Sequence, residues 1–501
     1  MDLELVFEEK VSRYPNLILW EEREQEETVD LIIPDSYPDG VGILQAYGTP
    51  LIYAMETTNE AATVSGEVQG GVLYQGAEGE IRSVKARVPF AFRRELKENA
   101  ENLRLFCTCR LLSADARLLN SRKILLRMTV QCSIRLYGEK ECRSFDVSEP
   151  APTLQLKRTE LPLRLPFSLG EKRFSLQEEL PIPRELPEAA QLMKITYDPL
   201  VIEQKAVGDK AVFKGELRVH ALWEDEEEQL FCHSWALPFS QYVTMECQIE
   251  DCDLATELSL LSADTQPDQQ EGGRLLTAVE LCAQTMATGV VNYVLIEDAF
   301  CTDGTLQPSL VEQQLTACLD QQEFRETVEL QAEVQAASVL CASAYPTKLF
   351  RRREGDQLLL EQGLCCDVLY YDGEKNLCSC RLKGTLPLTI PLMENVSCRV
   401  QRLLCREPYC TLSAGLLKVK LPVELWLESS AEHQLNAVSG GEVVPLEEKG
   451  RKPSLLLRFT EEAESLWDIA KSCKTSTAAI RQSNDLVGDT VPANTLLLIP
   501  M

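Results

Sequence analysis

The sequence has no apolar run long enough for a membrane-spanning helix, which needs about 18 to 20 consecutive apolar residues. The stretch from Val290 to Ile296 is short and is interrupted by Asn292. We therefore expect no membrane insertion. Basic residues are also few, since 50 lysines and arginines stand against 78 aspartates and glutamates, a formal charge of −28. Because this excess repels nucleic-acid phosphates, nucleic acid is a poor candidate partner.

The common signatures of catalysis are missing as well. There is no Gly-x-Ser-x-Gly elbow and no Gly-x4-Gly-Lys-Ser/Thr phosphate loop. Histidines number only three, and His233 directly follows Cys232. Adjacent residues of a strand point to opposite faces, which disfavours this pair as nucleophile and base. We predict a protein that is not an enzyme, with no catalytic residue and no cofactor.

The 19 cysteines form no pair of Cys-x2-Cys motifs. The chain starts with the acidic run Met1-Asp2-Leu3-Glu4, where a secretory signal is basic, so we expect a cytoplasmic protein with reduced thiols. Cys107-x-Cys109 and Cys378-x-Cys380 could offer soft ligands to zinc. Residues two apart on a strand share one face, however, and a free cysteine behaves as a small buried apolar residue. The favoured interpretation is core packing, with no metal site.

The most informative feature is a long internal repeat, in a chain whose 501 residues predict about three or four folding units. At a constant offset of 149 residues, Pro50, Gly66, Glu67, Tyr74, Pro89 and Phe90 match Pro199, Gly215, Glu216, Trp223, Pro238 and Phe239. A looser third copy places Pro346, Gly363, Tyr370, Pro387 and Leu412-Ser413-Ala414 in the same order. We interpret Tyr74, Trp223 and Tyr370 as equivalent buried anchors, because aromatic side chains bury large areas.

Each copy has the two-residue alternation of a β-strand. Apolar residues at every second position from Ile124 to Leu136 predict a long half-buried strand, and Leu417 to Leu427 repeat it in the third copy. Pro422 has no backbone N–H to donate to a neighbouring strand, and it therefore indicates an edge strand there. Val64–Tyr74 and Ile81–Val88 read as a hairpin. The pattern predicts a mainly β protein of three tandem antiparallel β-sandwich or barrel-like repeat domains.

The predicted organisation places linkers where prolines, glycines or polar residues gather. It runs as an acidic leader (1–27), a first β repeat (28–139), a linker (140–174), a second β repeat (175–290), a third β repeat (311–430), a linker (431–453) and a carboxy-terminal module (454–501). Two acidic runs, Glu21 to Glu27 and Glu224 to Glu228, could be electrostatic docking surfaces. We favour solvated segments that keep the chain soluble.

The carboxy-terminal module has a different pattern of strand, helix, helix and strand. Ser465 stands three residues before Asp468 in a capping-box-like start, and Ser476 can cap a second helix. The module resembles a LysM domain in three segments: Ser465-Leu466-Trp467-Asp468-Ile469-Ala470, Ser483-Asn484-Asp485-Leu486 and Leu497-Leu498-Ile499-Pro500. It differs where Ala463-Glu464-Ser465 replaces the family's Gly-Asp-Thr.

The LysM resemblance implies a small βααβ domain that grips N-acetylglucosamine polymers such as peptidoglycan in a groove between two loops. The binding residues that it implies, toward glycan or protein, are Glu462, Ala463, Glu464, Ser465, Asn484, Asp485, Leu486 and Val487. The expected structural core is Leu466, Trp467, Ile469, Ile480 and Leu498.

The repeats also carry a resemblance. Residues 32–39, Ile-Ile-Pro-Asp-Ser-Tyr-Pro-Asp, and 120–123, Asn-Ser-Arg-Lys, resemble the SPOCS domain of spore-forming Firmicutes. Several such domains followed by one LysM domain resemble the SipL family of spore coat assembly proteins. That resemblance implies a scaffold in the mother-cell cytoplasm, recruited to the forespore surface through binding of its LysM domain to the spore coat morphogenetic ATPase.

Two other functions stay open at this point. One is a cell-wall protein that binds peptidoglycan, and the other is a hydrolase that its LysM domain only targets. A protein partner agrees best with the expected cytoplasmic location, because a membrane separates the cytosol from wall glycan.

Overall fold

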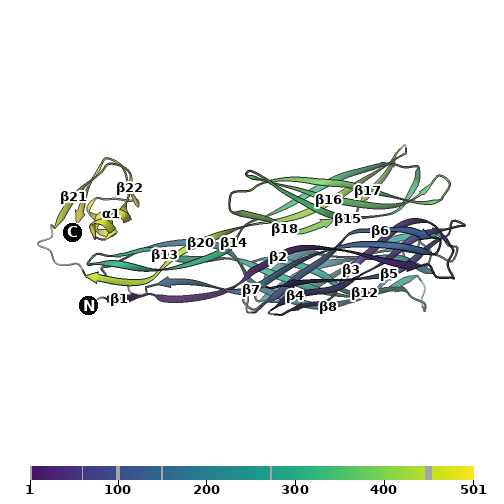
Figure 1. Cartoon of the computed structure of the whole chain (residues 1–501), viewed down its shortest axis with the longest axis horizontal. Helices are drawn as coiled ribbons and strands as arrows, with labels where there is room; N and C mark the ends of the chain where they lie inside the picture. Colours follow the sequence, from purple (N-terminus) through teal and green to yellow (C-terminus); the bar gives the residue numbers. More distant parts are fainter. Residues whose placement is uncertain are drawn as a thin grey trace.

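The computed structural model describes residues 3–58, 60–96, 102–147, 151–270, 273–413, 415–445 and 454–501, and almost all of them outside the carboxy-terminal module lie in antiparallel strands (Figure 1). The expected mainly β fold is confirmed. Within the described residues no helix is both long and apolar enough to cross a membrane.

The first unit is a sandwich of two three-stranded sheets, β2-β7-β6 and β3-β4-β5. Its strands are β2 (Glu8–Ile32), β3 (Gly40–Thr57), β4 (Ala61–Gly76), β5 (Ile81–Glu95), β6 (Arg104–Asn120) and β7 (Lys123–Asp146). The alternating apolar residues from Ile124 to Leu136 lie in its core, together with Val64, Val68 and Val72. The predicted strand and the predicted β4–β5 hairpin are both confirmed.

The same strand order occurs twice more. The second unit consists of β8 (Leu154–Pro181), β9 (Gln191–Val207), β10 (Lys210–Glu224), β11 (Leu230–Thr244), β12 (Asp253–Pro267) and β13 (Arg274–Cys301). The third consists of β14 (Gly304–Glu333), β15 (Ala336–Glu354), β16 (Gln357–Asp372), β17 (Leu377–Pro391), β18 (Val396–Cys405), β19 (Tyr409–Ser413) and β20 (Leu416–Pro445). A short strand, β1 (Leu3–Val6), pairs with β20.

One packing contact explains the glycine of the repeat in the first two units. Gly66 lies opposite Phe90, and a Cβ there would come within 2.4 Å of the Phe90 ring and 2.2 Å of the Leu51 carbonyl oxygen. Gly215 and Phe239 repeat this arrangement, with 2.4 Å to the ring. The missing side chain therefore makes room for the aromatic ring of the neighbouring strand.

The predicted aromatic anchors are buried in two units. Tyr74 and Trp223 are 0% exposed. The Tyr74 hydroxyl donates to the Pro38 carbonyl oxygen at 3.0 Å, and the Trp223 indole donates to that of the equivalent residue, Pro187, at 3.1 Å. Tyr370 is only half-buried. The anchor prediction is thus confirmed in the first two units and holds in part in the third.

The predicted leader and linkers are wrong as local structure. Residues 8–27 belong to β2, residues 140–146 end β7, residues 154–174 begin β8, and residues 431–445 belong to β20. Residues 446–453 of the second linker lie outside the described residues. The prolines of β8 are tolerated because this strand bonds to β13 along its length but to β14 at only one described residue pair.

The long first and last strands of the units extend past the sandwiches as a narrow stalk (Figure 1). The stalk has an apolar core of its own, to which all three units contribute: Phe7, Tyr14, Cys142 and Phe145 from the first, Leu163, Tyr293, Leu295 and Ile296 from the second, and Leu315, Leu435 and Val438 from the third. The stretches that the composition suggested as flexible therefore build a structural element.

The third unit corrects two predictions. Pro422 does not mark an edge strand, because β20 has β14 on one side and β18 and β19 on the other. The gap between β18 and β19 lies opposite Pro422, which removes the need for a donor there. Leu412 and Ser413 pair with Leu417 and Leu416 at the end of a hairpin, so they are not the counterparts of residues 112 and 113. Ala414 lies outside the described residues.

The three units meet around an approximate three-fold axis. Gln45, Lys194 and Ser343 follow one another at intervals of 149 residues. The Lys194 ammonium donates to both of the others at 3.0 Å and is 4% exposed. Around this point lies a cavity of about 410 Å³, lined by equivalent segments of the units that include residues 45–50, 194–201 and 342–346. The repeat therefore produces a closed assembly instead of a string of separate domains.

Both acidic runs take part in contacts between units. Glu22 pairs with Arg351 of the third unit at 3.0 Å, and Glu224 pairs with Arg82 of the first unit at 2.9 Å. Glu224 is only 5% exposed. Our expectation of solvated acidic segments is therefore wrong at these residues, which bind neighbouring units of the same chain.

Substitution Gly66→Ala tests the packing argument. We expect a loss of about 1 to 3 kcal/mol, because the added Cβ overpacks a well-filled core. The urea midpoint of unfolding measures the effect. Gly42→Ala is the matched control in the same sheet, since a Cβ there meets no atom within 4 Å. Equal midpoints for the two variants would show that the contact with Phe90 does not select glycine.

Candidate functional site

The carboxy-terminal module has the expected βααβ order. It consists of β21 (Leu455–Thr460), β22 (Glu464–Ser465), α1 (Leu466–Cys473), α2 (Thr477–Ser483), β23 (Thr490–Val491) and β24 (Thr495–Pro500). Its core contains Leu466, Ile469, Ala470, Ile480, Val491, Leu497 and Ile499. Leu498 was predicted for this core but is 39% exposed, because the residues on either side of it point inward.

The two predicted helix caps differ. The Ser476 hydroxyl accepts from the Ala479 backbone N–H at 3.1 Å, as expected. Ser465 has the extended backbone of an N-cap, but its side chain makes no capping hydrogen bond. Its strand pairing with Thr490 holds it instead. The capping-box prediction at Ser465 and Asp468 is therefore wrong in its hydrogen bond, although α1 begins at the expected residue.

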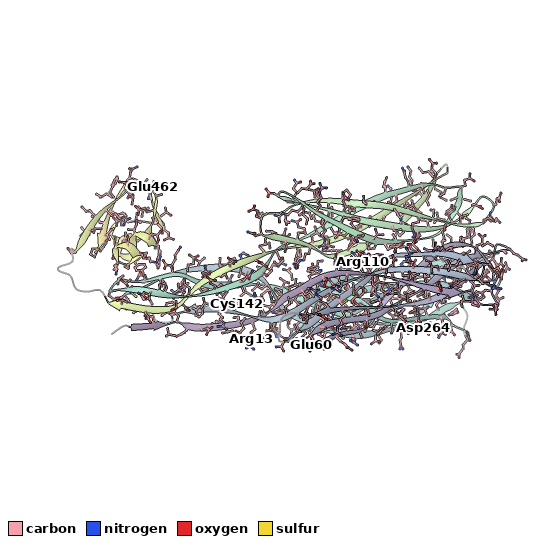
Figure 2. All side chains as sticks on the ribbon, viewed as in Figure 1. Arg13, Glu60, Arg110, Cys142, Asp264 and Glu462 are labelled. Carbon is pink, nitrogen blue, oxygen red and sulfur yellow. The ribbon has the colours of Figure 1, made fainter. Side chains whose placement is uncertain are left out.

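The structure brings the two predicted loops together. The short strands β22 and β23 pair Glu464 with Val491, and the Leu466 backbone N–H donates to the Asp489 carbonyl oxygen at 2.8 Å. The first predicted loop, residues 462–466, therefore lies beside the end of the second, residues 484–491. In Figure 2, Glu462 lies on the outer side of the module, away from the stalk.

Only some of the predicted binding residues present free side chains. Glu462, Ala463, Asp485 and Val487 are exposed, Val487 by 98%. Asn484 is occupied, since its amide binds the Leu498 backbone N–H and carbonyl oxygen, both at 2.7 Å. The remaining three predicted binding residues also have partners. Glu464 forms an ion pair with Arg458 at 2.6 Å, Ser465 lies within β22, and Leu486 packs against the core of the module.

The sheet β21–β24 turns an apolar face to solvent, and the sequence analysis missed it. Alternation along the two strands puts Leu455, Leu457, Phe459, Leu496 and Leu498 on this face, which we call the outer face; they are 49%, 62%, 57%, 60% and 39% exposed. The alternation Leu455, Leu457, Phe459 was read only as a strand. The signal for an exposed apolar face was that apolar residues occupy every second position of β21 and β24 on one face, while the other face also has leucine and isoleucine beside Arg458, Thr460 and Thr495.

The opposite side of the module contacts the tip of the stalk. The Trp467 ring packs edge-on against Phe300 with centroids 4.9 Å apart, and its indole N–H donates to Asp298 Oδ2 at 2.8 Å. The Lys471 ammonium lies 2.7 Å from the same oxygen. Trp467 was predicted as module core, but only part of it is buried there and the rest contacts the stalk.

Asp298 is the electrostatic centre of this contact. Burial alone would raise the pKa of its carboxyl, but hydrogen bonds from Lys471 and Trp467 outweigh burial and lower the pKa below its ordinary value. The carboxylate is therefore stabilised by the module, and the module is held by the carboxylate.

A LysM domain family profile matches residues 461–500 of the chain. No curated protein and no solved structure matches the chain in the other two comparisons. The match covers the two loops and both helices, so the chain carries a LysM domain, which is a binding domain and not a catalytic one.

Substitution Asp298→Asn tests the contact between module and stalk. We expect it to weaken docking of the module by about 1 kcal/mol or less, roughly fivefold, because the ion pair is half-exposed. Fluorescence energy transfer between dyes on the module and on the stalk measures the docked fraction. Asp485→Asn, on the exposed loop, is the control and leaves this fraction unchanged.

The same contact predicts a pH dependence. Because docking lowers the pKa of Asp298, its contribution is complete at neutral pH and is lost as the pH falls through the carboxyl range below about 4. A docked fraction that stays constant as the pH falls through that range would contradict this role of Asp298.

Proposed function

We propose that the chain is a non-enzymatic scaffold in bacterial endospore coat assembly, and that its LysM domain binds a coat morphogenetic protein. The observation that carries the protein–protein part is the outer face of β21–β24. Five apolar side chains gather there without a partner within the described part of the chain. Contiguous exposed apolar patches on soluble domains typically mark interaction sites.

The chemistry of this face suits a folded protein partner. The central pair, Leu457 and Leu498, lies in register between Phe459–Leu496 on one side and Leu455–Pro500 on the other. No charged side chain belongs to these pairs. Interface centres are similarly depleted of charge and enriched in aromatic and apolar residues.

The spore coat assignment rests on the resemblance of the repeats to SPOCS domains and of the domain order to the SipL family. The three-unit body fits a scaffold, because its units bind one another through ion pairs and a shared axis and so hold the module at the end of the stalk. On this proposal the protein acts in the mother-cell cytoplasm, is recruited to the forespore surface, and has the morphogenetic ATPase as its partner.

A second function is favoured by a different observation. The LysM match covers residues 461–500, and the two loops that bind glycan in this family meet in this chain. The alternative is therefore a protein that binds N-acetylglucosamine polymers of peptidoglycan through Glu462, Ala463, Asp485 and Val487.

Two variants of the full chain separate these functions. Leu457→Ser/Phe459→Ser alters the outer face, and Val487→Ser alters the loop, at positions exposed enough to leave the core intact. We expect the first variant to lower the affinity for the morphogenetic ATPase by about 30-fold or more. This corresponds to a loss of about 2 kcal/mol of binding free energy, which is typical when residues at the centre of an interface are replaced. Val487→Ser should have little effect. Pull-down of the two purified proteins measures the difference.

Sedimentation with insoluble peptidoglycan is the complementary measurement. The glycan alternative would replace the scaffold proposal if the full chain sediments with peptidoglycan and chitin oligomers abolish this binding. Under that alternative, Val487→Ser lowers the bound fraction and the outer-face variant leaves it unchanged. In sporulating cells, deletion of residues 455–501 should abolish recruitment of a fluorescent fusion to the forespore. Unchanged recruitment would refute docking through the module.

A further inference from the structure

Three cysteine sulfurs meet inside the first unit. Cys107 and Cys109 lie two residues apart on β6, and Cys132 lies on β7 directly opposite Cys109. The Cys132 Sγ is 2.7 Å from the Cys109 Sγ and 3.1 Å from the Cys107 Sγ. All three sulfurs lie within 4.8 Å of one another, and all three residues are free cysteines.

The cluster is deep but connected to the cavity on the axis. Cys107 and Cys132 are 0% exposed, whereas Cys109 lines the cavity between the units. Figure 2 shows the next residue, Arg110, where the first unit faces the third. Two sulfurs are therefore enclosed by protein, and the third is open to an interior space that a small ion can enter.

The other two units show what packing requires at this place. The register puts Thr256, Leu258 and Ala283 at the equivalent positions of the second unit, and Val400, Leu403 and Leu425 at those of the third. Both units fill the site without sulfur. Core packing in this fold therefore does not explain why the first unit has three cysteines at one point.

The chemistry of the cluster suits a soft cation. Cysteine binds a metal as the thiolate, and sulfur ligands suit zinc. The three sulfurs at one point therefore supply three of the four ligands of a tetrahedral zinc site.

We propose that Cys107, Cys109 and Cys132 form a zinc site with three thiolate ligands and a fourth position open toward the axial cavity. Tetrahedral zinc with zinc–sulfur bonds of about 2.3 Å places its sulfurs about 3.8 Å apart, so the two short separations widen when zinc enters. Each of the three thiols loses its proton to solvent as its bond to zinc forms. Thiolate ligands select zinc over magnesium and calcium.

The test uses the full chain, purified with a reductant and stripped of metal by a chelator. Co²⁺ is the spectroscopic probe, because thiolate ligands give it a charge-transfer absorption in the near ultraviolet. We expect this band to appear with Co²⁺ and to vanish when Zn²⁺ displaces it. Equilibrium dialysis should then retain one zinc ion per chain.

The decisive variant takes its residues from the second unit. In Cys109→Leu/Cys132→Ala, leucine and alanine occupy the positions that Leu258 and Ala283 occupy in the second unit. We expect this variant to lose both the cobalt band and the retained zinc. Cys109→Ser is a second, more conservative variant, altering the one ligand that lines the cavity. Thermal unfolding followed by circular dichroism checks that each variant is folded.

The matched control is Cys378→Ser/Cys380→Ser, which removes a pair of the same spacing from the third unit and should keep the band. The proposal is overturned by wild-type protein without a thiolate–cobalt band, by zinc retained equally in Cys109→Leu/Cys132→Ala, or by mass spectra showing a Cys109–Cys132 disulfide in the reduced preparation.

Discussion

The pairing between the first and last strand of each unit is the constraint on which the rest of the structure depends. β2 pairs with β7, β8 with β13 and β14 with β20, each in one antiparallel ladder that runs from the sandwich into the stalk. The same ladder holds the first and last strands of a sandwich together and also fixes where its unit joins the other two. The stalk core, with residues from all three units, forms because the three ladders end side by side.

Contacts between units near the axis combine buried polar pairs with an apolar cluster that includes Tyr47, Met193 and Leu369, whereas those in the stalk core are mainly apolar. The buried ion pair of Arg135 with Glu257 and the hydrogen bonds of Lys194 tie equivalent or neighbouring positions of different units together. Removing one partner would leave a buried charge uncompensated, so such contacts discriminate strongly against a wrong register. Apolar burial is therefore supplied both in the stalk and near the axis, and the buried polar pairs add specificity.

The sequence predicted those parts of the fold in which side-chain periodicity reports directly on burial. The offset of 149 residues and the strand from Ile124 to Leu136 were visible in it, and the two module loops followed from the resemblance to a LysM domain. The wrong predictions have one cause, because the sequence of one segment does not tell which strand or side chain lies beside it in the fold. Pro422 was misread because the break at residues 406–408 lies elsewhere in the chain, and Leu498 because the alternation of β24 does not say which face is inward. The acidic runs looked solvated because Arg82 and Arg351 are far away in sequence.

The placement of the module shows how the body and the LysM domain work together. Trp467 and Lys471 direct one side of α1 to Asp298 at the stalk tip, so this side is occupied within the chain itself. The outer face of β21–β24 and the loop residue Val487 stay exposed in the same arrangement. A partner on either surface therefore meets a module that is already oriented, and less conformational entropy is lost on binding than with a freely tethered domain. Because the stalk that holds the module is built by all three units, a defect in any unit would weaken binding at a site that it does not touch.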